Sequence, residues 1–160
     1  MTATWHSLID WDALPSGFVD ADDLNEQLRD NLEWLKARPF NSVNNTTQTT
    51  TSATFVEMTS SSIAVTSVGG NMIIVANGKV WNTTAANITL DLAIDGTRQG
   101  DATNGLTVVS QGGATRYDCV DMVWFTSTPP SAASHNYSVY WKTNAGTASG
   151  LFRVYAMEIR

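Results

Sequence analysis

The stretch "NITLDLAIDGT", Asn87–Thr97, decides the fold, because its apolar and polar residues alternate with the period of two that a β-strand requires. The apolar face is predicted to carry Ile88, Leu90, Leu92 and Ile94. The opposite face carries Asp91, which predicts that this face meets solvent. Asp95-Gly96 then predicts a tight turn, since Asp-Gly suits the left-handed backbone of a two-residue hairpin.

Similar runs recur on both sides of this strand and continue to the end of the chain. Each is short, most of them alternate, and Gly-Gly, Asn-Gly or Pro-Pro breaks separate them. They are "TFVEM", "SSIAVTS", "NMIIVANGKVW", "GLTVVSQGG", "RYDCVDMVWFTS", "HNYSVYWKT" and "SGLFRVYAMEI". About eight strands at this spacing predict a mainly β protein with a single antiparallel β-sandwich over residues 53–160, and the number suits a jelly roll.

The composition fits a β-rich domain with a neutral polar surface. Of the 160 residues, 42% are hydrophobic and only 15% are charged, and Thr, Ser, Asn and Gly make up the difference. A net charge of −6 argues against a nucleic-acid partner and against a membrane, because nucleic acids and anionic membrane surfaces are bound through clustered Lys and Arg. No run has the length of a transmembrane helix, and no secretory signal is evident at the start.

One helix is predicted ahead of the strands, over residues 19–39, "VDADDLNEQLRDNLEWLKARP". Asp20 is a suitable N-cap and Pro39 ends the helix. Its apolar seam steps by four, three and four residues and consists of Leu24, Leu28, Asn31 and Leu35, with Leu32 beside it. This heptad spacing favours self-association, in which Asn31 would fix the register. Packing of the seam on the chain's own sandwich is the alternative.

The segments on either side of this helix differ in character. Residues 1–18 form an apolar arm broken by Pro15 and Gly17. The arm's large apolar side chains are Trp5, Leu8, Ile9, Trp11, Leu14 and Phe18. Two interpretations of the arm remain open, packing on the protein's own β domain and docking onto a partner. Residues 40–52, "FNSVNNTTQTTTS", contain little to bury and predict a polar linker or an extended lead-in at a sheet edge.

The sequence contains no motif for catalysis, a cofactor or a metal. Neither His6 nor His135 has a companion residue that would make it a base or a ligand. The acids inside strand runs are Asp91, Asp118 and Asp121, and paired acids of glycosidase type can come from distant strands. A polar, solvent-facing role is the simpler interpretation. We therefore predict no catalytic residue, no cofactor, no metal site and no enzymatic activity.

Two further features are assigned to the core. Cys119, the single cysteine, lies in a strand-like run and is expected to be a buried structural thiol. Tyr137, Val139 and Trp141 alternate with Tyr140, and alternating aromatic residues in a sandwich are mostly core. A ligand face that stacks on sugars is the alternative for this aromatic stripe.

Several stretches together resemble small virion proteins of tailed bacteriophages, in which an "ADLN…LRDN…L" helix precedes a β domain. The helix segment resembles that motif, and the likeness continues through "TSATFVEMTSSSIAVTSVGG", "LAIDGTRQG" and "SHNYSVYWKTNAGTA". The resemblance covers most of the chain from about Phe18 to the end. It implies a homotrimer on the phage surface, either in a fibre or as a decoration on the head.

The resemblance also implies where such a protein works. Shaft repeats are absent from the sequence, which favours a head decoration or cement protein over a long fibre. Residues Leu24, Leu28, Asn31, Leu32 and Leu35 would then form the trimer interface, and the arm would dock on the major capsid protein or another virion protein. The protein would be made in the host bacterial cytoplasm and reside on the virion surface. A tail fibre or receptor-binding tip that recognises a host surface glycan is the alternative, and an envelope-degrading enzyme is a third.

Overall fold

A computed structural model describes residues 28–29, 32, 38–113 and 116–159 of the chain. The chain divides into two compact units, Met1–Arg38 and Pro39–Arg160. In the first unit, Leu28 and Leu32 are exposed. The arm and almost all of the predicted helix lie outside the described residues, so both stay predictions. Among the described residues, no helix is long and apolar enough to span a membrane.

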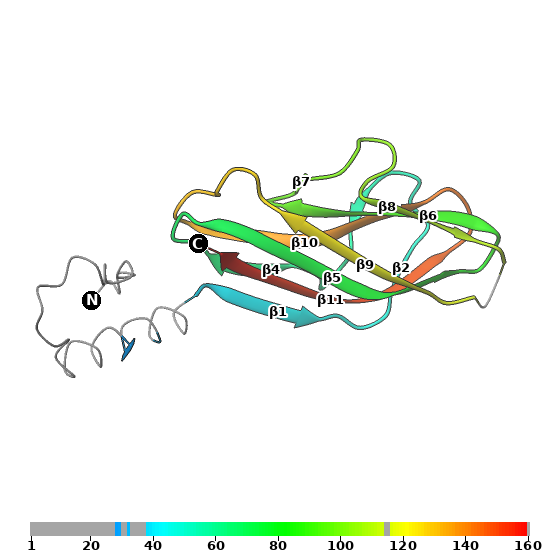
Figure 1. Cartoon of the computed structure of the whole chain (residues 1–160). Helices are drawn as coiled ribbons and strands as arrows, with labels where there is room; N and C mark the ends of the chain where they lie inside the picture. Colours follow the sequence, from blue (N-terminus) through cyan, green and yellow to red (C-terminus); the bar gives the residue numbers. More distant parts are fainter. Residues whose placement is uncertain (1–27, 30–31, 33–37, 114–115, 160) are drawn as a thin grey trace, which may run out of the picture. The chain divides into compact units, whose positions relative to one another are not determined.

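The second unit is built from two antiparallel sheets (Figure 1). Sheet 1 has five strands: β1 (Phe40–Asn44), β2 (Gln48–Thr50), β5 (Asn71–Asn82), β9 (Asp118–Phe125) and β11 (Ala148–Ile159). Sheet 2 has six: β3 (Val56–Glu57), β4 (Ile63–Thr66), β6 (Ala86–Ile94), β7 (Thr97–Arg98), β8 (Thr107–Gln111) and β10 (Ser134–Thr143). The prediction of a mainly β, antiparallel sandwich is therefore confirmed.

The order of strands places distant parts of the chain side by side. In sheet 1 the order is β1-β11-β5-β9, with β2 also paired to β11. In sheet 2 the order is β3-β10-β6-β7, with β4 paired to β10 and β8 to β6. The chain changes sheet between β2 and β3, β4 and β5, β5 and β6, and at each step from β8 to β11. Apart from the β6–β7 hairpin, the sheets are thus assembled from non-local pairings.

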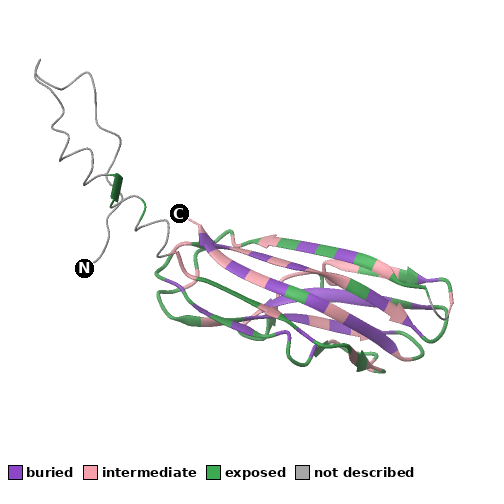
Figure 2. Cartoon of the chain, turned by 90° about the horizontal axis from the view of Figure 1, so that it is seen from below, coloured by how far each residue is buried: buried purple, intermediate pink, exposed green. Residues whose placement is uncertain are grey.

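The core lies between the two sheets, and the strands contribute to it with a period of two. Along β5 and β11 buried residues alternate with more exposed ones (Figure 2). The largest fully buried side chains are Trp141, Tyr137, Phe152, Met58, Met72, Ile74, Ile88, Leu90 and Leu92. The aromatic stripe of β10 is therefore core, as predicted, since Tyr137, Val139 and Trp141 are all buried.

The prediction of a linker over residues 40–52 is wrong. β1 pairs with β11 from Phe40↔Met157 to Asn44↔Arg153, and β2 pairs with β11 around Thr49↔Ser149. The alternative, a lead-in at a sheet edge, is what the structure shows. Polar side chains are tolerated here because backbone hydrogen bonds to β11 hold the segment and the side chains mostly face solvent.

The strand that decides the fold is more deeply buried than predicted. Its apolar face is in the core, and the hairpin turn is confirmed, with positive φ at Asp95 (49°) and Gly96 (76°). The opposite face is also buried, and the prediction that Asp91 meets solvent is wrong, because its exposed fraction is 0%. The segment after the turn folds back over this face, and the Gly100 N–H donates to Asp91.

Candidate functional site

The predicted association residues fall mostly outside the described part of the chain. Of the predicted trimer interface, the structure describes Leu28 and Leu32, which are 58% and 47% exposed. The other three, Leu24, Asn31 and Leu35, and all six docking residues of the arm lie outside the described residues. The two leucines that are described are thus open to a partner, and the interface stays a prediction.

The three candidate acids do not converge on one site. Asp91 lies in sheet 2, whereas Asp118 and Asp121 both lie in β9 of sheet 1. Because Asp118 and Asp121 are three residues apart in a strand, their side chains point to opposite faces. Asp118 accepts hydrogen bonds from Gln111 and Arg116. Among the described residues, no group of three or more His, Cys, Asp or Glu could hold a metal ion.

Asp91 forms a largely buried ion pair with Arg98, which we call the clasp, and is not part of a reactive centre. Its Oδ1 accepts the N–H groups of Leu92 (2.8 Å) and Gly100 (2.9 Å), and its Oδ2 lies 3.0 Å from Arg98 Nη1. Burial raises the pKa of Asp91, while the two backbone N–H groups and the Arg98 guanidinium lower it. Arg98 in turn lies over the Phe55 ring, 3.8 Å from its centroid. The clasp therefore fixes the segment that follows the hairpin turn.

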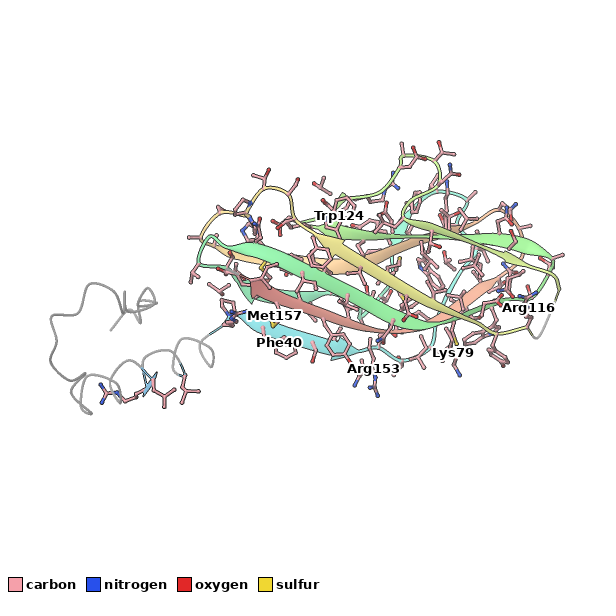
Figure 3. The ribbon with its side chains drawn as sticks, in the orientation of Figure 1. Phe40, Lys79, Arg116, Trp124, Arg153 and Met157 are labelled. Atoms are coloured by element: carbon pink, nitrogen blue, oxygen red, sulfur yellow. The ribbon has the colours of Figure 1, made fainter. Side chains whose placement is uncertain are left out.

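The outer face of sheet 1 carries an apolar band at one end. The paired rows Phe40–Met157–Ile73–Phe125 and Tyr155–Val75–Val123 cross its strands. We call these seven residues the apolar band. Phe40, Val123 and Phe125 are 56%, 51% and 58% exposed. Phe40 and Met157 lie beside one another at the end of the sheet where β1 begins (Figure 3). We treat this band as a candidate interaction surface.

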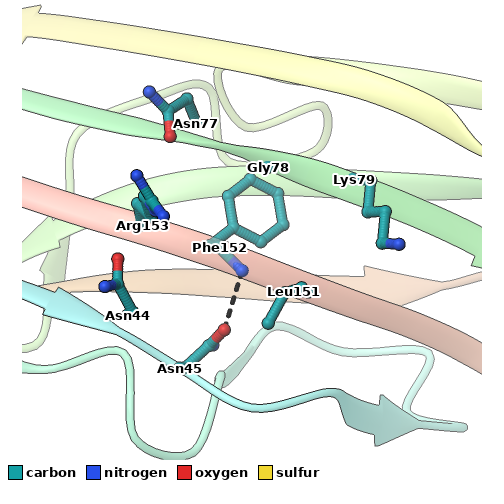
Figure 4. A pocket seen from close by; sticks show the side chains of 8 residues that line it. All are labelled: Asn44, Asn45, Asn77, Gly78, Lys79, Leu151, Phe152 and Arg153. Atoms are coloured by element: carbon teal, nitrogen blue, oxygen red, sulfur yellow. Dashed lines mark hydrogen bonds between the residues drawn. The ribbon is translucent and has the colours of Figure 1, made fainter.

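The same face becomes polar in the next row. Asn44, Arg153, Asn77 and Asp121 follow one another across β1, β11, β5 and β9. Beyond them, Leu151 of β11 pairs with Lys79 of β5. A pocket of about 400 Å³ opens here, lined by Asn44, Asn45, Asn77, Gly78, Lys79, Leu151, Phe152 and Arg153 (Figure 4). Five of its eight lining residues are polar, so we call it the polar pocket, although most of its lining surface is apolar. Its volume lies within the roughly 300–1,000 Å³ range of small-molecule sites.

The pocket forms where the edge of sheet 1 is interrupted. β1 ends at Asn44 and β2 begins at Gln48, so β11 lacks a paired strand between them. Asn45 replaces the missing ladder: its N–H donates to the Phe152 carbonyl (3.0 Å) and its Oδ1 accepts the Phe152 N–H (2.7 Å). Opposite, Gly78 lets β5 and β11 pack closely, because a Cβ there would lie 2.9 Å from the core ring of Phe152. The interruption of the edge strand keeps the pocket open.

An aromatic pair continues the polar pocket along β5. The rings of Trp81 and Tyr117 have centroids 5.0 Å apart. Lys79 Nζ lies 5.9 Å from the Trp81 centroid and 5.3 Å from that of Tyr117. Both aromatic residues keep exposed surface, and Tyr117 is 60% exposed. A ligand in the pocket that extends past Lys79 would reach this pair.

The sequence alone did not identify this pocket. Its polar residues come from three strands that lie far apart in the chain, and their proximity depends on the strand order. The prediction that Cys119 is buried is also wrong, because Cys119 is exposed. It pairs with Lys79 on the outer face, while Val120 and Met122 face the core.

No family model matches the chain, and no curated protein matches it. Among solved structures, it is similar to the C-terminal CBM6, a carbohydrate-binding module, of LamC, a marine laminarinase from Zobellia galactanivorans. The TM-score is 0.32 and the sequence identity is 15%, over 72% of this chain and 98% of the module. A likeness at this level carries no conclusion about function, which must come from the residues described above.

Proposed function

We propose that the protein is a non-enzymatic structural protein of a phage virion, a homotrimeric decoration that stabilises the head and presents its sandwich outward. The apolar band on the outer face of sheet 1 carries this proposal, because exposed apolar surface across four strands suits assembly with other protein surfaces. The virion setting is supported by the sequence resemblance. The pairing order of the strands supports a jelly roll, the fold that the resemblance implies.

The mechanism of such a protein is physical. Apolar surface is removed from water at the contacts between copies and at the contact with the capsid. A protein that binds only the assembled lattice stabilises that lattice by mass action. In this proposal the arm residues 1–18 dock on the capsid, and the seam of residues 19–39 joins three copies.

The proposal is tested with the full chain and a variant that lacks residues 1–18. We expect both proteins to be trimers by native mass spectrometry, and only the full chain to bind capsids assembled without it. A truncated protein that still decorates capsids would contradict the docking role of the arm. A monomeric full chain at micromolar concentration would contradict the trimer.

The second candidate function is a tail fibre or receptor-binding tip that recognises a host surface glycan. The polar pocket favours it, since amide and cationic side chains converge there beside an aromatic pair. It is tested by incubating the fluorescently labelled full chain with host cells. Saturable adsorption that free host polysaccharide competes away supports this function, and the absence of adsorption contradicts it.

A further inference from the structure

We propose that the polar pocket binds an acidic saccharide, whose carboxylates meet Lys79 at one end of the pocket and Arg153 at the other. The inference rests on the second candidate function, for which it names the class of ligand. Lys79 and Arg153 are diagonal neighbours, because Leu151 pairs with Lys79 and Arg153 with Asn77. Both line the pocket (Figure 4).

The charges of the pocket favour an anionic ligand. Neither Lys79 nor Arg153 forms an ion pair or a side-chain hydrogen bond with any of the described residues, and the Lys79 ammonium lies over the Trp81 and Tyr117 rings. Two neighbouring positions of the sheet thus present cations without a carboxylate partner among the described residues, in a chain of net charge −6. Asp121 lies on the same face, beyond Asn77. Its repulsion directs an anionic group toward the opposite side, where Arg153 stands.

The remaining groups favour a sugar as the carrier of that charge. Asn44 and Asn77 each offer an amide that donates and accepts, which matches hydroxyl groups. Asn45 is 4% exposed, and its Nδ2 is a buried donor with no hydrogen-bond partner among the described residues. Pairing this nitrogen with a ligand oxygen requires a shift of the pocket lining, and it would make a hydrogen bond that folding leaves unmade. The aromatic pair Trp81 and Tyr117 supplies an apolar surface for a second sugar ring.

The inference is tested by calorimetric titration of the full chain with two probes, a tetrasaccharide of galacturonic acid and a hyaluronan tetrasaccharide. We expect saturable binding of at least one probe. The methyl ester of the bound probe keeps every sugar ring and removes only the charge, and it should bind at least about tenfold more weakly. Binding of neither probe, or equal binding of acid and ester, would overturn the inference.

Variants locate the site. Lys79→Gln and Arg153→Gln should each weaken binding on the order of tenfold, since each removes one charge-assisted contact. Lys142→Gln is the matched control, because Lys142 lies in sheet 2 over the Phe55 ring and loses the same charge. Asn45→Asp retains an oxygen for the Phe152 N–H and adds a negative charge to the pocket lining, so it too should weaken binding of an anion. Unchanged affinity in both Lys79→Gln and Arg153→Gln would show that the saccharide binds elsewhere.

Two further measurements distinguish this inference from a non-selective carboxylate site and from the receptor function. A tetraglutamate peptide that binds as tightly as the uronic acids would show a carboxylate site that does not select saccharides, which overturns the assignment. If the chain adsorbs to host cells and Arg153→Gln adsorbs equally, host recognition survives and this inference fails. If the tetrasaccharide binds and no cell adsorption occurs, the pocket stands and the receptor function fails.

Discussion

Arg98 holds its guanidinium 3.0 Å from the Asp91 carboxylate, and the Asp91 side chain is fully buried while that of Arg98 is 23% exposed. The pair joins β7, the second strand of the hairpin, to the face of β6 that lies opposite the core side chains Leu90 and Leu92. A buried carboxylate that loses its cation is costly, because nothing replaces the lost charge interaction. Asp91 therefore requires a cationic side chain at position 98.

The variant Arg98→Met is expected to lower the free energy of unfolding by about 3 kcal/mol at pH 7, measured by urea denaturation. Arg153→Met is the control, since Arg153 is exposed and its loss should cost no more than about 0.5 kcal/mol. Adding Asp91→Asn to Arg98→Met should restore part of the loss. Equal stability of Arg98→Met and the control would contradict the clasp.

The cost of Arg98→Met is expected to depend on pH. Burial raises the pKa of Asp91 above 3.8, so its protonated form contributes stability below that pH, and this contribution is lost as the pH rises through the folded-state pKa. A neutral Asp91 needs no cation. The destabilisation measured at pH 7 should therefore shrink as the pH is lowered toward 3.8, and a penalty that grows would contradict this reasoning.

His135 and Asp95 predict a second pH dependence. His135 Nδ1 lies 2.7 Å from Asp95 Oδ2, and Nε2 lies 3.0 Å from the Ser131 carbonyl oxygen. Both ring nitrogens face acceptors, so the protonated ring fits best, and the hydrogen bond to Asp95 raises the pKa of His135 above 6.5. The stabilisation is fully present below pH 6.5 and is lost as the pH rises through the folded-state pKa of His135.

The measurement is the melting temperature between pH 5 and pH 9, compared with His135→Gln. We expect the wild-type melting temperature to fall more steeply above pH 6.5 than that of the variant. On the acid side, the hydrogen bonds to Asn136 and His135 lower the pKa of Asp95 below 3.8 despite its partial burial. The contribution of Asp95 is thus present above pH 3.8 and lost as the pH falls through its folded-state pKa. Parallel curves for wild type and variant would contradict this role of the pair.

The strands and the sandwich could be predicted from the sequence because burial imposes a period of two on each strand. The stretch Asn87–Thr97 shows what this period of two can predict and what it cannot. Its apolar face and its turn were predictable from local pattern, whereas the burial of Asp91 depends on a later segment that folds back over the strand. The sequence around an acidic residue in a strand does not indicate whether another segment of the chain will cover that residue.

The face assignment of β9 shows why Cys119 was misplaced. Each face of this strand carries one acid and several apolar residues, so alternation alone could not decide which face is buried. The prediction of a linker over residues 40–52 was wrong for a different reason. An edge strand that is held by backbone hydrogen bonds needs few apolar residues. The polar pocket depends on the order β1-β11-β5, which local sequence does not encode.

Tyr137→Phe is expected to stabilise the protein. The Tyr137 ring is core, its exposed fraction is 0%, and its Oη is buried without a hydrogen-bond partner among the described residues. Burial is also the main cause that raises the pKa of Tyr137 to about 12. Removing an unpaired buried hydroxyl should raise the free energy of unfolding by about 1 kcal/mol in urea denaturation. A loss of stability would indicate that the hydroxyl is bonded, through ordered water for example.

The apolar band predicts how the copies associate. The band is two rows deep on strands spaced about 4.8 Å apart, with β1 contributing Phe40 alone, and covers about 230 Å². This is well below the roughly 800 Å² per partner of a standard interface, so the band needs a second contact. In the proposed trimer the seam of residues 19–39 supplies that contact, and in sequence it ends where the band begins, at Phe40.

The double variant Val123→Lys/Phe125→Lys places two charges in the band on side chains that are already about half exposed. We expect its melting temperature to stay within a few degrees of wild type, because neither side chain belongs to the core. Its dissociation constant for the oligomer should rise on the order of hundredfold, since burying each apolar side chain contributes about 1.5 kcal/mol or more. Val108→Lys, on an exposed position of sheet 2, should leave the dissociation constant unchanged. Analytical ultracentrifugation over a dilution series gives the constants, and an unaltered oligomer in the double variant would remove the band from the interface.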